Sequence, residues 1–297
     1  MIKIGELLKQ NNIKATRLSK KGKATLVDSE NGRYVVKEGK RNKEIYDYLR
    51  SRNFDYFPKV IGKFEDTEIT EYQDNLDYPS EQKVLDMIDL VALLHNKTTY
   101  HKDVDNDTYI KIYEDLLNNL AYLESYYDDM ISMIESKVYA SPSEYLFARN
   151  VSKIYFALEN SKTKLETWRE LVSDKKKQRV VVLHNNLDLS HFIKNDNSYL
   201  LSWDRAKFDM PLFEIYKLYR KNQNLNFTEI LNRYESSYPL LDDEKYLLYV
   251  LITMPDILEF VDNEFTNTKK VRSFIESLSK YEDIISENNS IDNTNEI

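Results

Sequence analysis

Hydrophobic and polar positions follow two different patterns along this chain of 297 residues. Between residues 14 and 72 the apolar residues fall in short β-rich runs, interrupted by one segment with helical spacing. We predict strands at 24–29, 33–37, 57–61 and 68–72, and a helix at 41–52. Glu30-Asn31-Gly32 is a hairpin signal between the first two strands. The predicted order is β-β-α-β-β.

A polar, proline-containing linker follows at residues 74–80, and almost everything beyond it has helical periodicity. In the first helical segment the residues Leu85, Ile88, Val91 and Leu94 share one face. We predict further helices at 107–139, 143–173, 212–222, 226–236, 242–262 and 266–285. The exception is 179–204, where a buried-strand pattern is followed by a polar loop and a second hairpin that turns at 195–197.

These patterns predict an α+β chain with a two-lobed protein-kinase-like fold. The small β-rich N-lobe would be residues 1–73, and the large helical C-lobe would be residues 74–285, with the catalytic-loop hairpin at 179–204. The polar tail at 286–297 is predicted to be disordered.

Composition excludes several classes of function. Hydrophobic residues make up 41% and charged residues 31% of the chain, as in globular proteins. No apolar run approaches the roughly 20 residues that span a bilayer, and no signal peptide is evident, so we expect a cytoplasmic protein. There are no cysteines, which excludes disulfides and thiol chemistry. The net charge of −8 argues against a nucleic-acid partner.

The strongest chemical signal lies between Val180 and Arg220. This segment resembles the catalytic region of the aminoglycoside/choline kinase superfamily, and it is most similar to spore-coat-associated kinase-like proteins of Gram-positive bacteria. The family pattern is a strand, His-x-Asp-x-x-x-x-Asn, and a hairpin that ends in Ile-Asp-(aromatic or Leu)-Asp. An Asp-x-Pro loop and an acidic residue that opens the next helix then follow.

The resemblance places different residues at the family's three chemical positions. Asn186 takes the place of the catalytic aspartate, and His191 takes the place of the metal-binding asparagine. Ser202 stands where the metal-binding aspartate is expected, with Asp204 two residues further on. The site would then be degenerate, and we expect no metal there, with Asp204 as the remaining candidate ligand.

Other positions keep the family pattern, and the resemblance assigns them supporting roles. His184, Asp209 and Glu214 would be scaffold residues. Lys37 would be the ATP-phosphate lysine and Glu44 its ion-pair partner, with the backbone near Glu71 and Tyr72 holding the nucleotide. In chain order, the positions that match are Lys37, Glu44, Leu93, Leu94, His95, His184, Asp209, Pro211 and Glu214.

The replacements remove the chemistry that phosphoryl transfer needs. The amide of Asn186 can orient a hydroxyl but cannot take its proton, and general base catalysis contributes a factor of about 10²–10⁴. Ser202 offers magnesium a neutral hydroxyl where a carboxylate is preferred. The imidazole of His191 suits zinc or copper better than magnesium. All three changes point to a loss of catalysis.

Structural roles account for several of the same residues. Lys37 and Glu44 can form an exposed ion pair of little energetic weight. Asp188, Asp204 and Asp209 can stabilise turns, because no glycine follows position 62.

We therefore weigh three functions. The first is a pseudokinase that acts as a binding or assembly protein, with a protein partner, in the spore coat as the resemblance implies. Its cofactor would be ATP bound without magnesium, or it would have none. The second is an active ATP-dependent phosphotransferase on a small-molecule hydroxyl, in which Asp204 and Asp188 supply the missing carboxylates. The third keeps only the fold and binds an unrelated ligand.

Overall fold

The computed structural model describes residues 2–22, 24–39, 42–222 and 224–292. They form two compact units. Unit 1 comprises Met1–Tyr100, Val180–Asp209 and Asn232–Tyr238, and unit 2 comprises His101–Arg179, Met210–Leu231 and Pro239–Ile297. The predicted lobe boundary at residues 73 and 74 stays a prediction.

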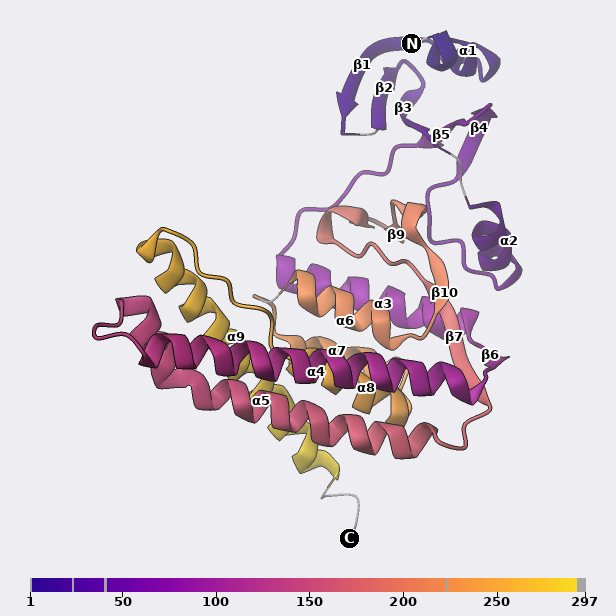
Figure 1. The fold of residues 1–297 in the computed structure, drawn as a ribbon. Helices are drawn as coiled ribbons and strands as arrows, with labels where there is room; N and C mark the ends of the chain where they lie inside the picture. The colour runs from indigo at the N-terminus through magenta and orange to yellow at the C-terminus, as the bar shows by residue number, and fades with distance from the viewer. Residues whose placement is uncertain (1, 23, 40–41, 223, 293–297) are drawn as a thin grey trace. The chain divides into compact units, whose positions relative to one another are not determined.

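Unit 1 begins with a five-stranded antiparallel sheet in the order β1-β2-β3-β5-β4 (Figure 1). Its strands are β1 (Ala15–Lys21), β2 (Ala24–Ser29), β3 (Gly32–Glu38), β4 (Val60–Phe64) and β5 (Thr67–Glu71). Two helices belong to the same region, α1 (Ile2–Gln10) and α2 (Lys43–Ser51). The strand predicted at 57–61 begins later, at Val60, and follows Pro58, which has no N–H to donate to a ladder.

One face of this sheet is buried against α1. Val27, Val36 and Ile69 are buried and belong to one core cluster with Leu7 and Leu8 of the helix. Neither α1 nor β1 was among the predicted elements. In β1 nearly every residue is exposed, so the strand lacks the apolar alternation by which strands are recognised.

The remainder of unit 1 includes α3 (Ser80–Thr98) and most of the segment that carries the family resemblance, Val180–Asp209. Strand β7 (Lys177–Leu183) is followed by the short hairpin β8 (Phe192–Lys194) and β9 (Ser198–Leu200), as predicted. Strand β10 (Lys207–Asp209), which was not predicted, pairs antiparallel with β7 and sets Phe208 opposite Val182.

Unit 2 is built mainly from helices. They are α4 (Asn106–Glu135), α5 (Pro142–Val172), α6 (Leu212–Lys221), α8 (Asp242–Thr253) and α9 (Glu264–Asp292). The unit boundaries fall at or within three further elements: β6 (Tyr100–Asp103), β7 and α7 (Phe227–Ser237). The long helices α4 and α5 lie side by side (Figure 1). A capping box formed by Ser141 and Glu144 begins α5.

Two predicted helix ends differ from the structure. The helix predicted at 242–262 ends at Thr253, and Met254 is extended because the residue before a proline, in this case Pro255, is disfavoured in the helical region. Helix α9 extends to Asp292 and so overlaps the predicted disordered tail at 286–297. The last part of that tail, 293–297, lies outside the described residues.

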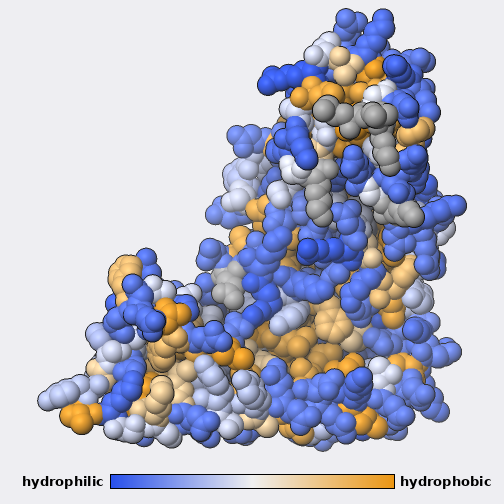
Figure 2. Space-filling view, turned by 45° about the horizontal axis from the view of Figure 1, so that its top comes forward, coloured by the Kyte–Doolittle hydropathy of each residue, from blue (hydrophilic) through white to orange (hydrophobic). Residues whose placement is uncertain are grey.

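The surface in Figure 2 is mostly hydrophilic, with apolar residues gathered in separate groups. Within the described ranges, no helix combines the length and the apolar character that crossing a membrane requires.

Candidate functional site

The candidate site lies in unit 1, where β7 leads into the loop at residues 184–191. Val181, Val182 and Leu183 are fully buried, and β10 pairs with this end of the strand. The loop closes in a 3₁₀ turn, Leu189–His191, from which β8 begins. A buried strand on one side and a hairpin on the other therefore fix both ends of the loop.

His184 connects the start of this loop to the end of the hairpin. Its ring is fully buried, and Nε2 lies 2.7 Å from the backbone oxygen of Leu201. A carbonyl oxygen only accepts hydrogen bonds, so Nε2 carries the proton. The ring also meets the indole of Trp203 edge to face, with centroids 4.7 Å apart. The scaffold role expected of His184 stays a prediction.

The three replaced positions lie together. Asn186 Nδ2 donates to the backbone oxygen of Ser202 over 3.3 Å. His191 Nδ1 donates to the backbone oxygen of Asn186 over 2.8 Å. The backbone N–H of Leu201, next to Ser202, donates in turn to the backbone oxygen of His191 at 2.8 Å. Asn186, His191 and Ser202 thus belong to one hydrogen-bonded group.

Lys37 of β3 reaches the same group. Its Nζ donates to Ser202 Oγ across 3.5 Å, which is at the long limit for a hydrogen bond. Ser202 has a left-handed backbone, with φ of 63° and ψ of 53°. We call Lys37, Asn186, His191 and Ser202 the four-residue cluster. The sequence pointed to each of its members, but only the fold joins Lys37 to residues more than a hundred positions away.

Asp188 and Asp204 have other surroundings. Asp188 Oδ1 accepts from the backbone N–H of Ser190 at 2.8 Å and from its hydroxyl at 2.6 Å, which caps the 3₁₀ turn. Asp204 is exposed in the next 3₁₀ turn, Trp203–Arg205. In the part of the chain that the structure describes, no three histidine, aspartate or glutamate side chains are grouped so that they could hold a metal ion.

Two acidic residues bear on Lys37: Glu44, which the sequence predicts as its partner, and Glu68, which the sequence did not single out. Glu44 is exposed in the first turn of α2, a position favoured by the helix dipole, and its pairing with Lys37 stays a prediction. The sheet register sets Glu68 of β5 directly opposite Lys37, and Glu68 is only 7% exposed. Lys63 of β4 donates to Glu68 over 3.2 Å. No signal in the sequence pointed to this carboxylate, because Thr67, Glu68 and Ile69 are all buried and the burial along β5 does not alternate.

The segment predicted to hold a nucleotide through its backbone is fixed at several points. The backbone N–H of Tyr72 donates to the backbone oxygen of Arg33 at 3.0 Å. Glu71, at the end of β5, pairs with Tyr34 of β3. Further on, the N–H of Leu76 donates to the backbone oxygen of Lys194 in the β8–β9 hairpin at 2.8 Å. Nothing in these contacts identifies a ligand.

The two remaining predicted scaffold residues belong to different units. Asp209 ends β10 in unit 1 and forms an ion pair with Lys207. Glu214 lies in the first turn of α6 in unit 2 and is 1% exposed.

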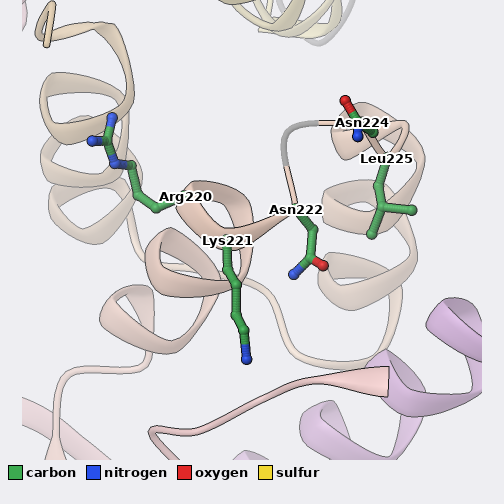
Figure 3. Close-up of a pocket in the computed structure, with 5 residues that line it drawn as sticks. All are labelled: Arg220, Lys221, Asn222, Asn224 and Leu225. Atoms are coloured by element: carbon green, nitrogen blue, oxygen red, sulfur yellow. The ribbon is translucent and has the colours of Figure 1, made fainter. Parts of the chain in front are cut away.

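A pocket of about 450 Å³ lies elsewhere, at the end of α6 in unit 2. Figure 3 shows the Arg220 and Lys221 side chains pointing in opposite directions. The guanidinium of Arg220 forms an ion pair with Asp256, and its Nη1 donates to Asp256 Oδ2 over 2.9 Å. The basic groups therefore do not converge on one ligand, and the described lining of the pocket contains none of the predicted site residues.

The four-residue cluster has a definite chemical character. Its side chains are an ammonium, an amide, an imidazole and a hydroxyl, and none is a carboxylate. Such a set can donate hydrogen bonds to an anion. It provides neither the carboxylate base of a kinase nor the carboxylate ligand that magnesium prefers.

Comparison with known proteins gives a clear result for the fold. No protein-family model matches the sequence. No curated protein matches it either. Among solved structures, the chain is similar to an aminoglycoside phosphotransferase from Alicyclobacillus acidocaldarius, with a TM-score of 0.67 and 10% sequence identity over 95% of this chain and 94% of the other. This likeness confirms the predicted fold class, the α+β kinase-like fold.

Two further neighbours align at TM-scores below 0.5, too low to support an argument. The choline kinase LicA from Streptococcus pneumoniae has a TM-score of 0.49 and 16% identity over 92% of this chain and 98% of that one. A spectinomycin phosphotransferase in complex with ADP and spectinomycin has a TM-score of 0.45 and 13% identity over 94% of this chain and 92% of that one.

Proposed function

We propose that this chain is a pseudokinase: a protein of aminoglycoside-phosphotransferase-like fold that binds a nucleotide without magnesium and does not transfer phosphate. The observation that supports this most directly is the four-residue cluster. Asn186, His191 and Ser202 are bonded to one another and to Lys37, in a chain whose fold is that of a phosphotransferase.

The loss of catalysis follows from the electrostatics of the transition state. Phosphoryl transfer develops charge on the phosphate oxygens, which kinases neutralise with carboxylate-bound magnesium. In this chain Lys37 faces a serine hydroxyl, and His191 directs its Nδ1 proton to a backbone oxygen. The relocated carboxylates have their own roles, Asp188 as a turn cap and Asp204 at the surface, so they do not replace the lost ligands.

In this proposal ATP is bound by Lys37, by Glu44 as its partner, and by the backbone near Glu71 and Tyr72. The nucleotide then acts as a structural ligand, and the chain acts as a binding or assembly protein. The resemblance to spore-coat-associated proteins suggests that its partner is another protein, in the spore coat or in the cytoplasm of a sporulating bacterium.

A thermal-shift titration tests the nucleotide part of the proposal. We expect ATP to raise the melting temperature equally in EDTA, in magnesium and in manganese, and Lys37→Ala to abolish the shift. Product analysis after long incubation of ATP with magnesium should show no turnover. A shift that requires metal and disappears in Asp204→Ala would instead support an active phosphotransferase.

A gain-of-function variant makes the test sharper. Asn186→Asp combined with Ser202→Asp restores the two carboxylates of the family pattern at positions that the fold already brings together. We expect the ATP-induced shift of this variant to become dependent on magnesium. The matched control is Ser202→Asn, which keeps Asn186 and so has amides of the same shape at both positions without the charge. Its shift should stay independent of metal.

A further inference from the structure

The register of the N-terminal sheet places a second lysine in line with Lys37. Lys21 of β1 pairs with Ala24 of β2, and Ala24 pairs with Lys37 of β3. Directly paired residues on neighbouring strands project from the same face of a sheet. Lys21 and Lys37 therefore lie on one face, separated by the small side chain of Ala24.

The neighbouring lysine projects from the other face. Lys20 pairs with Thr25, and Thr25 pairs with Val36, which is buried in the core against α1. Since successive residues of a strand alternate between faces, Lys20 and Lys21 point in opposite directions. Both lysines are exposed, so the main difference between them is the face that they occupy.

The same row of paired residues continues beyond Lys37. It passes to Glu68 of β5 and then to Lys63 of β4, and Lys63 Nζ donates to Glu68 Oε1 over 3.2 Å. The carboxylate of Glu68 is thus bonded on the side away from Lys21. Lysines outnumber carboxylates along the row, so the row favours an anionic ligand.

The distance between the two in-line lysines suits a polyphosphate chain. Neighbouring strands lie about 4.8 Å apart, so residues two strands apart in one row are separated by roughly 9.5 Å along the sheet. Long, flexible lysine side chains can both reach an anion held between them. Gly22, with φ of 60°, makes the tight turn that returns the chain to β2 immediately after Lys21.

We infer that Lys21 and Lys37 together bind the polyphosphate tail of the nucleotide, and that Lys21 supplies the positive charge that magnesium supplies in an active kinase. The inference rests on the proposed function and adds a specificity: the ligand is a nucleoside di- or triphosphate free of metal. The four-residue cluster retains one cation at Lys37, and the row adds a second at Lys21.

The test is a titration of ATP, ADP and AMP by calorimetry in EDTA, with Lys21→Ala, its matched control Lys20→Ala, and Lys37→Ala. We expect Lys21→Ala to weaken ATP binding about tenfold and AMP binding by less than about twofold, because AMP lacks the polyphosphate tail. Lys20→Ala should bind all three nucleotides as the natural chain does. Removing one phosphate contact should also make the slope of log affinity for ATP against log salt concentration shallower by about one.

The outcomes separate this inference from the proposed function. Equal ATP affinity in Lys21→Ala and Lys20→Ala, with binding still lost in Lys37→Ala, would overturn the role of Lys21 and leave the pseudokinase proposal intact. A natural chain that binds no nucleotide in EDTA would overturn both. If the natural chain binds ATP more tightly in magnesium than in EDTA, the ligand is the metal complex and the substitution of lysine for metal is wrong.

Discussion

The two ends of β7 differ in how their polar side chains are paired. At its start, in unit 2, Arg179 forms a buried ion pair with Glu244, which is 1% exposed, and Arg179 Nη2 also donates to the backbone oxygen of Pro239 at 3.0 Å. Just beyond its end, in unit 1, the polar side chains of His184 and Asn186 donate hydrogen bonds to backbone oxygens. The chain therefore keeps a buried carboxylate at the start of the strand, where it anchors the fold, and has an amide at the end, where a kinase would need a carboxylate.

This contrast explains how the proposed loss of catalysis is compatible with an intact fold. A buried ion pair is costly to break, because the remaining charge has no compensation. An amide or hydroxyl in place of an active-site carboxylate removes a charge that the fold does not require, and neutral groups can satisfy one another. Substitutions at the start of β7 should therefore change the free energy of unfolding most.

The largest expected effect is that of Arg179→Met, which leaves Glu244 buried without its partner. We expect a loss of about 4 kcal/mol in the free energy of unfolding at pH 8, measured by urea denaturation. Burial already raises the pKa of Glu244 despite Arg179, and the substitution raises it further. When the folded pKa of a carboxyl group lies above its unfolded pKa, stability falls as the pH rises from the unfolded to the folded value. The loss should therefore be smaller at pH 5.

Arg233→Met is the matched control for this prediction. Arg233 donates to Asp89 through two nitrogens, each at 2.7 Å, but its side chain is half exposed. Losing this ion pair should lower the urea midpoint only slightly, because solvent screens the attraction between exposed charges. Equal shifts for the two variants would contradict the assignment of Arg179 as an anchor.

At the other end of β7, His184→Ala should have the next largest effect. It removes a fully buried ring, its hydrogen bond to Leu201 and its contact with Trp203. We expect a loss of about 3 kcal/mol in the free energy of unfolding. The half-buried His191, changed to Ala in the same way, should cost clearly less. The reverse order would mean that the scaffold role belongs to His191.

Asp188→Ala tests whether this carboxylate has a structural or a chemical role. Because Asp188 caps the turn at Ser190, we expect a loss of about 1 kcal/mol by urea denaturation. The affinity for ATP in EDTA should not change. A variant of normal stability that no longer binds nucleotide would place Asp188 in the site instead.

The smallest effect is expected for Asp204→Ala. Asp204 is exposed, and surface substitutions of this kind usually change stability by less than about 0.5 kcal/mol. Nucleotide-induced thermal shifts should be the same as those of the natural chain with and without manganese. Loss of a manganese-dependent shift in this variant would reinstate an active, rearranged site.

Most of the fold was predictable from the sequence because its elements carry their own signals. The valines before Leu183 and the turn at Asn195–Asn197 identify β7 and the β8–β9 hairpin without tertiary information. Strand β1 was missed because its side chains are mostly exposed and show no apolar alternation, and β10 was missed because three residues are too short a pattern. These strands depend on their partners for their conformation.

The candidate site was predictable residue by residue but not as a geometry. The order of Asn186, His191 and Ser202 matched a known pattern, whereas the approach of Lys37 to Ser202 depends on how the chain folds. Glu68 and Lys21 were missed for a related reason. Their positions relative to Lys37 follow from strand register, which a single sequence does not specify.

The left-handed backbone of Ser202 bears on which residues can replace it. At φ of 63° most side chains are strained, but aspartate and asparagine adopt this conformation more readily than other non-glycine residues. A substitution can therefore place an acidic side chain at position 202 with no remodelling of the main chain. In the proposed pseudokinase, the missing metal ligand at this position is in that sense recoverable.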